Sequence, residues 1–391
     1  MSRFCVDVGV KSLCKHGETL CGDWVEVVGQ DDQTLILVLA DGLGSGVKAN
    51  ILSTLTAKII SAMMLGGIGV EDCVRTMAAT LPVCDVRKVA YSTFTIIKVS
   101  GSLEAEIFQY ENPRVFLLRD GKNVPMTETQ EAVAGKAIVH SRVSLRENDT
   151  FVAVSDGVIH AGVGTRLNFG WQLPEVIGFM EKVYREEHTA KMLTSVLLEQ
   201  CDMLYGGKPG DDTTACTLKI RRRSPLNLLL GPPRDPEDDA RMLKLFFSKE
   251  GRRIVCGGTT SGLVASFLGK PLEVGLPEYR DPKIPPTAKI DGVDLVTEGV
   301  ITMSRVLEYA RDFLGENRLY MQWSRQQDGA SQIARMLFEQ ATDINFFVGQ
   351  AANPAHQNPD LPIAFNIKMQ LVEELTGVLQ KIGKRIKVSY F

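Results

Sequence analysis

The sequence contains no CxxC pair, no long apolar run and no block of basic residues, and each absence excludes a class of protein. Its eight cysteines are scattered over 391 residues, several of them in apolar runs, which predicts reduced, structural thiols rather than a zinc site or a disulfide framework. No stretch reaches the roughly 18 apolar residues of a membrane-spanning helix, and the N-terminus lacks the apolar core of a signal peptide. We therefore expect a soluble, cytoplasmic protein without membrane contact.

Charge is nearly balanced in this chain. There are 44 Lys and Arg residues against 47 Asp and Glu, a formal net charge of -3, and no basic run is dense enough to bind a polyanion. Nucleic acid is therefore excluded as the expected partner. The length predicts two domains, because single cores rarely grow beyond about 250–300 residues.

The signatures of nucleotide sites and of nucleophilic enzymes are also missing. Gly42, Gly44 and Gly46 form GxGxG rather than the dinucleotide-binding GxGxxG, because Val47 occupies the place of the third glycine. Neither a P-loop nor a GxSxG nucleophile elbow occurs, and Asp41 lacks the alternating acids of a calcium-binding loop. Covalent catalysis therefore has little support.

Three short motifs place aspartates at the ends of apolar segments. Leu37–Gly46 reads LVLADGLGSG, Val152–Val158 reads VAVSDGV, and Pro209–Thr214 reads PGDDTT. The apolar runs before Asp41 and Asp156 predict buried strands, where an unneutralised carboxylate is costly. One Asp-Gly pair would indicate only a tight turn, but three aspartate motifs in apolar surroundings favour a shared site.

Carboxylates that converge at one edge of a sheet, without histidine or thiolate, favour Mg²⁺ or Mn²⁺ over zinc. Two such ions, about 3.5–4 Å apart, would lower the pKa of a shared water and orient it for in-line attack on a phosphoryl group. The glycines after Asp41 and Asp156 would let metal and substrate approach the backbone. The motifs therefore predict metal-assisted hydrolysis of a phosphate ester.

Residue patterns predict strands and paired helices in an N-terminal domain, residues 1–222. The expected strands are Arg3–Val10, Thr34–Ala40, Ser92–Val99, Glu104–Tyr110, Arg114–Arg119, Ile138–Val143, Thr150–Val154 and Thr213–Ile220. The expected helices are Val47–Leu65, Val70–Leu81, Trp171–Tyr184 and Thr189–Leu204. Because strands often follow one another directly, we predict an α/β sandwich of antiparallel sheets.

Residues 223–391 are expected to form a smaller, Rossmann-like α/β domain with a parallel sheet. Proline, glycine and mixed charge at Arg221–Pro225 and Gly231–Asp239 predict a linker before it. The expected strands are Arg253–Cys256, Val293–Val296, Ile344–Gly349 and Ile386–Phe391, and the expected helices are Asp238–Ser248, Met303–Phe313, Ser331–Gln340 and Met369–Ile382.

The segment GGTTSG in this second domain predicts an anion-binding turn between a strand and a helix. Gly257 and Gly258 would admit close approach to the backbone, and Thr259, Thr260 and Ser261 would donate hydrogen bonds at the start of the helix. The same residues also fit an ordinary turn with a Thr or Ser helix cap. We expect a regulatory module that binds a small ligand or a partner protein.

The ordered motifs resemble those of the PPM-type (PP2C-like) metal-dependent serine/threonine phosphatases, and within that group the bacterial SpoIIE-like branch. The matching motifs, within roughly Arg3–Lys219, are Gly22-Asp23, LADGLGSG, Ser92-Thr93, VSDG and GDDTT. The resemblance implies an α-β-β-α sandwich that uses two Mn²⁺ or Mg²⁺ ions to dephosphorylate phosphoserine or phosphothreonine in a phosphoprotein.

The family's metal ligands, carried over onto this sequence, fall in the aspartate motifs. Asp41 would be shared by both ions, and Gly42 would supply a carbonyl oxygen. Asp156 and Asp211 would complete the second metal, with Asp211 preferred to Asp212 because the first acid of the closing motif ligates in the family.

Five further residues are expected at or near the site. Asp23 would contact a metal directly or through water, or else serve as a turn residue. The arginine with which some members hold the substrate phosphate has no clear match, so Lys11, Lys15 or His16 would substitute. His160, just after the second motif, is also near enough in sequence to reach the site.

Residues 47–81 occupy the place of a helical pair that is a switch in this branch, often at a dimer interface. A homodimer is therefore a further expectation. The alternative is that Ile51, Leu55, Ile59 and Met63 only pack on the sandwich.

Two other functions stay open at this point. One is a non-catalytic scaffold that binds a phosphoprotein, although the complete set of acids argues against it. The other is a small-molecule phosphate monoester hydrolase whose substrate is held by the GGTT segment.

Overall fold

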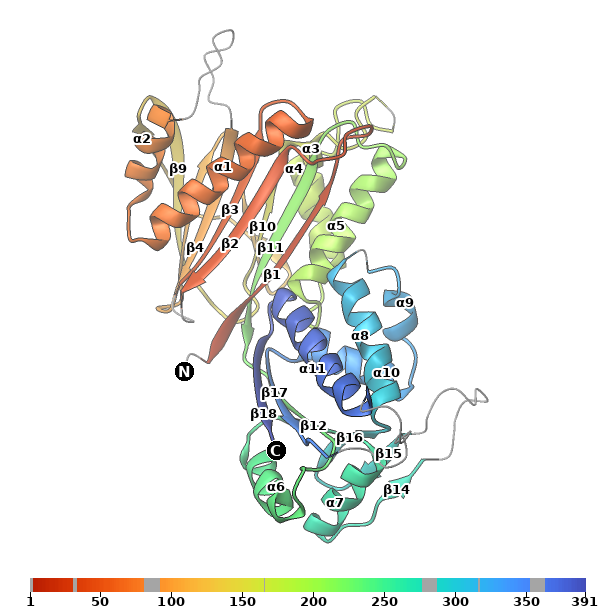
Figure 1. Ribbon diagram of the computed structural model, residues 1–391. Helices are drawn as coiled ribbons and strands as arrows, with labels where there is room; N and C mark the ends of the chain where they lie inside the picture. The colour runs from red at the N-terminus through yellow and green to blue at the C-terminus, as the bar shows by residue number, and fades with distance from the viewer. Residues whose placement is uncertain are drawn as a thin grey trace. The chain divides into compact units, whose positions relative to one another are not determined.

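The computed structural model describes the chain except for residues 1–2, 31–33, 81–91, 165, 276–286, 316 and 352–362. The described residues divide into two compact units, Met1–Arg222 and Arg223–Phe391. Figure 1 labels the elements of both units.

The first unit contains two antiparallel sheets and five helices. Its strands are β1 (Phe4–Leu13), β2 (Asp23–Gln30), β3 (Thr34–Gly42), β4 (Ser92–Ser100), β5 (Glu104–Tyr110), β6 (Phe116–Arg119), β7 (Lys122–Val124), β8 (Glu128–Val133), β9 (Lys136–Ser144), β10 (Thr150–Val154) and β11 (Thr213–Arg222). Its helices are α1 (Gly46–Leu65), α2 (Val70–Thr80), α3 (Asp156–Ile159), α4 (Leu173–Val183) and α5 (Ala190–Tyr205).

The two sheets pack face to face between helices. One sheet has the order β1-β11-β10-β6-β7 and the other β2-β3-β4-β5-β9-β8. Helix α1 lies over β2 and β3, while α5 lies against β1 and β11 (Figure 1). The predicted α-β-β-α sandwich is therefore confirmed.

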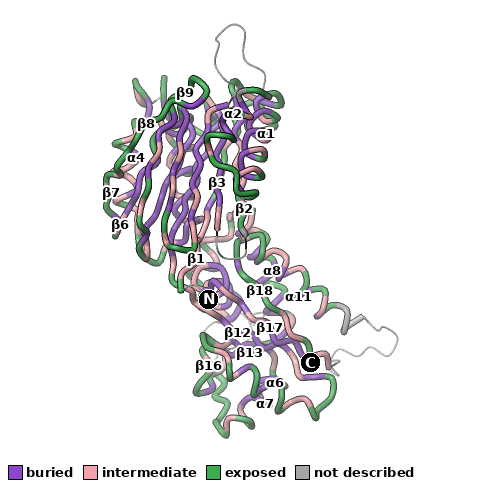
Figure 2. Tube along the Cα trace, turned by 90° about the vertical axis from the view of Figure 1, so that its left-hand side faces the viewer, coloured by how far each residue is buried: buried purple, intermediate pink, exposed green. Residues whose placement is uncertain are grey.

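Strand β3 is apolar from Leu35 to Ala40 because both of its faces are buried there. Leu37 and Leu39 point into the core between the sheets, whereas Ile36 and Val38 point into the core under α1 and α2. All four side chains are fully buried. Figure 2 shows β3 as mostly buried.

Besides the three-residue β7, two strands of the first unit were not predicted. Strand β2 mixes Asp and Glu with its valines, and most of its residues are only half-buried. Strand β8 has five exposed residues out of six and is held by antiparallel pairing with β9. Neither strand buries a continuous apolar face, so hydrophobic periodicity missed both.

Helix α1 forms where its apolar spacing predicted, but its buried face is different. Ile51 and Leu55 are 52% and 45% exposed. Leu52 and Ile60 instead lie on the buried face of the helix. The interpretation that Ile51 and Leu55 pack on the sandwich is therefore wrong.

The second unit is an open sheet with helices on both faces. Its strands are β12 (Pro225–Leu230), β13 (Arg252–Cys256), β14 (Glu273–Val274), β15 (Ala288–Ile290), β16 (Val293–Thr297), β17 (Asp343–Val348) and β18 (Arg385–Tyr390). Its helices are η1 (Pro236–Asp238), α6 (Asp239–Ser248), α7 (Gly258–Leu268), α8 (Val300–Leu314), α9 (Tyr320–Trp323), α10 (Gly329–Ala334), the π-helix η2 (Arg335–Gln340) and α11 (Ile363–Lys381).

The strand order in this sheet is β14-β15-β16-β13-β12-β17-β18. Strands β16, β13, β12, β17 and β18 are parallel to one another. Strands β15 and β14 form an antiparallel edge beside β16. One face packs against α8, α10 and α11, and the other against α6 and α7. This is a doubly wound α/β sheet.

The linker prediction is wrong for Gly231–Asp239. Strand β12 precedes that segment and lies in the middle of the sheet, so Gly231–Asp239 is a loop inside the second unit. Strand β12 was missed because its run LNLLL is short and stands directly before the proline-rich segment Gly231–Asp239.

Seven of the eight cysteines lie among the described residues, and all seven are free thiols. Cys84 falls outside the described residues. In the part of the chain that the structure describes, no helix combines the length and apolarity needed to cross a bilayer.

Candidate metal centre

Paired strands of the six-stranded sheet bring the first two aspartates together. Asp23 begins β2 and lies directly opposite Asp41, near the end of β3. The hydroxyl of Ser92 on β4 donates to the backbone oxygen of Asp41 at 2.9 Å and holds this end of the strand. Asp23 is 3% exposed. Two carboxylates from distant motifs therefore share one edge of the sheet.

The other acids come from the five-stranded sheet. Asp156 starts α3 directly after β10, and Asp211 and Asp212 come just before β11. Reciprocal hydrogen bonds of 2.9 Å join Ser155 and Thr214 between these segments. The antiparallel pairing of β10 with β11 therefore places Asp156 beside the closing acidic pair.

The two groups of acids meet between the sheets. A β-carbon on Gly22 would lie 2.7 Å from Oδ2 of Asp212, so Gly22 allows the two segments to approach. The negative charge of Asp156 raises the pKa of both Asp23 and Asp41, that of Asp212 raises the pKa of Asp23, and that of Asp211 raises the pKa of Asp41. The structure therefore gathers all five predicted aspartates.

The glycines after Asp41 and Asp156 have a packing role that the sequence did not reveal. A β-carbon on Gly42 would lie 2.2 Å from the backbone oxygen of Ala49 in α1. One on Gly157 would lie 2.2 Å from the backbone oxygen of Asp212. Both glycines therefore allow backbones to pack closely where the acids are positioned.

The acids shift one another's protonation. Burial first, and then the carboxylates of Asp23, Asp156 and Asp211, raises the pKa of Asp41 to about 9. Burial also raises the pKa of Asp23 to about 6, although the hydroxyls of Ser155 and Thr214 act to lower it. Burial and the charge of Asp156 raise the pKa of Asp211. The site therefore disfavours full ionisation unless positive charge is supplied.

Orphaned oxygens show that the donor set suits a hard cation. The hydroxyls of Ser155 and Thr214 lie close to Asp23, but among the described residues neither of its carboxylate oxygens accepts a hydrogen bond of ordinary geometry, and neither does the buried Oδ2 of Asp212. Buried carboxylates of this kind are stable when they are paired or bind a metal. Oxygen donors without sulfur or imidazole fit Mg²⁺ or Mn²⁺.

The aspartate side chains lie near one another but are not arranged as a metal coordination sphere. Among the described residues, no three His, Cys, Asp or Glu side chains stand as a group already arranged to hold a metal ion. We therefore expect the carboxylates to adjust their side-chain rotamers when an ion binds.

Of the proposed phosphate-holding residues, Lys15 lies at the site. Its Nζ is 4.0 Å from Oδ1 of Asp211, and its backbone N–H donates to Oδ1 of Asp212 at 3.0 Å. Lys11 instead pairs with Glu199 on α5 at 4.0 Å. His16 and His160 are both exposed.

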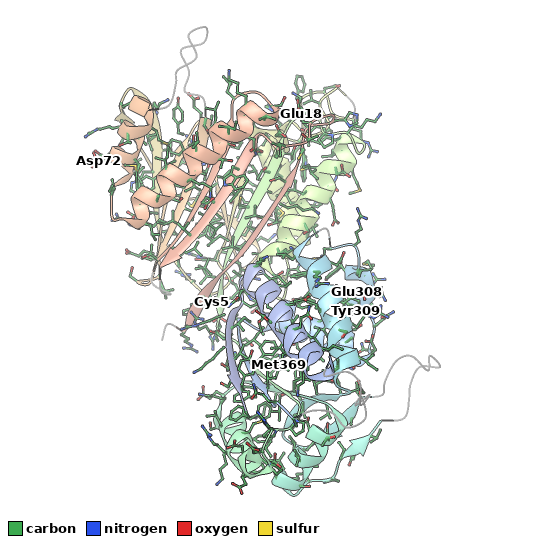
Figure 3. The ribbon with its side chains drawn as sticks, in the orientation of Figure 1. Cys5, Glu18, Asp72, Glu308, Tyr309 and Met369 are labelled. Atoms are coloured by element: carbon green, nitrogen blue, oxygen red, sulfur yellow. The ribbon has the colours of Figure 1, made fainter. Side chains whose placement is uncertain are left out.

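The loop that carries Lys15 is also connected to the start of α1. Glu18, labelled in Figure 3, accepts a 3.3 Å hydrogen bond from the hydroxyl of Ser45. A β-carbon on Gly46 would lie 2.6 Å from Oε2 of Glu18. This loop and the first turn of α1 therefore pack closely beside the acids.

Sequence reasoning missed the hydroxyl groups that surround Asp23. Ser155 and Thr214 belong to the motifs VSDG and GDDTT, but only their acids were singled out. A serine or threonine close to an acid in both motifs was the signal that could have identified these hydroxyl groups.

Metal-free stability is predicted to fall as pH rises. Between the pKa of about 3.8 of an ordinary Asp and the raised values of Asp23 and Asp41, the folded protein binds more protons than the unfolded chain. Each extra bound proton lowers the free energy of unfolding by about 1.4 kcal/mol per pH unit. In EDTA, the urea midpoint of the first unit should decrease from pH 6 to pH 8, and Mn²⁺ should restore it.

The matched control for this prediction is Asp41→Asn, which removes one titrating carboxyl and should flatten the pH dependence in EDTA. A midpoint that rises with pH, or an unchanged slope in the variant, would show that these carboxyls do not share the site as described.

A sandwich of two sheets between helices, with carboxylates gathered at the sheet ends, defines the fold class of the PP2C-like phosphatases. Residues 31–221 match the family model of Stage II sporulation protein E (SpoIIE). The resemblance predicted from the motifs is therefore confirmed for this part of the chain. The match does not extend into the second unit.

Solved structures of similar fold include the phosphatase domain of the cell fate determinant SpoIIE from Bacillus subtilis, at 17% identity and TM-score 0.45 over 57% of this chain and 96% of that one. The RsbU and RsbW domains of Rv1364c from Mycobacterium tuberculosis share 15% identity at TM-score 0.48, over 62% and 70% of the two chains. RsbX in complex with magnesium shares 19% identity at TM-score 0.39, over 55% and 95%. No curated protein matches this chain.

Proposed function

We propose that this protein is a metal-dependent protein serine/threonine phosphatase. The observation that carries the proposal is a cluster of five aspartates in the part of the chain that matches the SpoIIE family model. Asp23 and Asp212 are buried, the other three are half-buried, and the buried oxygens of Asp23 lack hydrogen-bond partners of ordinary geometry. A cluster of like charges in a protein interior is costly and persists where it has a function.

In this proposal Asp41, Asp156 and Asp211 hold two divalent ions, with Asp23, Asp212 and the carbonyl of Gly42 completing the ligand set. When bound, Mn²⁺ or Mg²⁺ supplies an acidified water and neutralises charge on the phosphoryl group. The charges of Asp23, Asp156 and Asp211 all raise the pKa of Asp41, which supports its role as the shared ligand. Lys15 holds the phosphate of a phosphoserine or phosphothreonine peptide.

The proposed activity is tested with a phosphoserine peptide and with p-nitrophenyl phosphate, in Mn²⁺, in Mg²⁺ and in EDTA. Hydrolysis of both substrates should require the ion. Lys15→Met should raise KM for the peptide more than it lowers kcat, because the lysine binds the phosphate in the ground state as well. Hydrolysis that persists in EDTA would contradict the proposal.

We also propose that the second unit regulates the first. Its doubly wound sheet has the architecture of ligand-binding domains and no part in the SpoIIE match. A chain ending at Arg222 should keep peptide hydrolysis while its rate changes relative to the full chain. Loss of all hydrolysis in a folded truncated protein would show that the second unit is part of the catalytic machinery.

A further inference from the structure

A cavity of about 130 Å³ lies in the second unit, at the carboxyl ends of the parallel strands. Residues following four neighbouring strands line it, among them Gly231 after β12, Gly257 after β13, Gly299 after β16 and Ala351 after β17. From β12, the strands β13 and β16 are added on one side of the sheet, and β17 and β18 are added on the other side. The strand order therefore reverses between β12 and β17. Ligands of doubly wound sheets bind at this reversal of strand order.

Two helices begin at this cavity. The first bond of α7 runs from Ser261 N–H to the oxygen of Gly257, and that of α8 from Met303 N–H to the oxygen of Gly299. Neither helix has a side-chain cap at its N-terminus. A β-carbon on Gly299 would lie 3.5 Å from Cα of Gly257, so the two helix starts are adjacent. Their free N–H groups and dipoles favour a negative charge in the cavity.

A buried lysine provides an independent sign of an anionic ligand. Lys368 on α11 lines the cavity and is 7% exposed. Its Nζ donates to the backbone oxygen of Gly349, and to that of Ala351 at 3.1 Å. Within the described residues it forms no ion pair with a carboxylate, and burial lowers its pKa. A buried ammonium without a counterion is costly, and a bound anion would compensate it.

The remaining lining restricts the kind of anion. Leu230, Val300 and Ile301 make part of the wall apolar, while Glu298 is exposed at the edge and offers a carboxylate. A carboxylate repels a second charge but accepts hydrogen bonds from hydroxyl groups. The volume is also below the roughly 300–1,000 Å³ typical of pockets for larger ligands.

We propose that this cavity binds a small phosphomonoester that carries hydroxyl groups, with its phosphate at the starts of α7 and α8 near Lys368 and a hydroxyl on Glu298. The dianionic phosphate matches two helix N-termini and one ammonium. The GGTTSG segment thus contributes mainly backbone N–H groups. Of its hydroxyls, that of Ser261 is already used, donating to the oxygen of Gly257 at 2.8 Å.

The test uses the full chain in EDTA, where the aspartate cluster holds no ion that could bind phosphate. Inorganic phosphate and glycerol 3-phosphate are titrated by calorimetry, with sodium chloride at equal ionic strength as the blank. Hydrogen exchange of a peptide covering residues 257–262 reports binding at the proposed place. We expect both compounds to bind and to protect this peptide, with glycerol 3-phosphate binding more tightly.

Four variants separate binding from folding. A β-carbon on Gly258 would meet nothing within 4 Å, and aspartate is tolerated in a first helical turn, so the Gly258→Asp protein should fold. Its carboxylate would repel the phosphate and should abolish binding. Gly258→Asn is its uncharged match and should keep binding within about threefold, since only the charge differs. Lys368→Met should weaken binding by about tenfold or more, the value of a charged hydrogen bond. Lys244→Met, at an exposed position of the same unit, should have no effect.

The proposal fails if neither compound protects residues 257–262, or if Gly258→Asp binds as the unchanged protein does. Equal affinities for phosphate and glycerol 3-phosphate would overturn the assignment of a hydroxyl-bearing ligand. None of these outcomes depends on phosphatase activity, so this proposal and the proposed function are tested separately.

Discussion

Replacing Asp41 with asparagine is expected to reduce hydrolysis of a phosphoserine peptide by at least about 10²–10³-fold, the range found when one group that stabilises transition-state charge is removed. Asp41 is the acid whose protonation responds to Asp23, Asp156 and Asp211 together. It therefore lies where a cation shared by both sheets would be held. Asparagine keeps the shape but lacks the charge that binds a divalent ion.

The loss should not result from unfolding. Because the substitution removes one of several crowded carboxylates, the metal-free variant should be at least as stable as the unchanged protein at pH 8. Asp72→Asn is a matched control, since Asp72 lies on the exposed surface of α2 (Figure 3) and should keep full activity. An Asp41→Asn protein that hydrolyses the peptide at the normal rate would refute the proposed site.

Replacing Gly42 with alanine is expected to damage both stability and activity. The new β-carbon would lie within 3 Å of three backbone atoms of Ala49, none of which can move without moving α1. Overpacking of this kind costs about 1–3 kcal/mol. If α1 or the end of β3 shifts to relieve the contact, Asp41 moves with it. Urea unfolding in Mn²⁺ and peptide hydrolysis measure the two effects.

Gly178→Ala is the matched control for that substitution. Gly178 lies inside α4, where a β-carbon meets nothing within 4 Å. Alanine should stabilise this helix by about 0.5–1 kcal/mol and leave hydrolysis unchanged. If Gly42→Ala behaved like Gly178→Ala, the close approach of β3 and α1 would not be needed for the site.

The strands that end in acids were predictable because both of their faces are buried. A segment such as β10, with all five residues buried, consists almost entirely of apolar residues, and its acid follows beyond its end. Strands β2 and β8 could not be recognised because pairing with a neighbouring strand, rather than an apolar face, holds them. Because β2 was not recognised, the sequence did not show that Asp23 lies opposite Asp41.

Helical spacing predicted α1 but did not identify its inner face. Apolar residues occur at Ile51 and Leu55 and also at Leu52 and Ile60, and the buried face is completed by small residues such as Ala57. A helix with apolar residues on more than one side has no unique orientation in the sequence. The contact with β2 and β3 selected one face.

The aspartate motifs by themselves marked the residues that are proposed to carry the chemistry, because a carboxylate directly beside a buried apolar strand is costly unless something neutralises it. The GGTTSG segment likewise indicated a strand-to-helix turn suited to an anion. Only the tertiary structure decided that acids from two different sheets meet, that glycines set their spacing, and that Lys368 lines a cavity with two helix starts. These arrangements depend on strand pairing between residues far apart in the chain, and local sequence patterns do not encode that pairing.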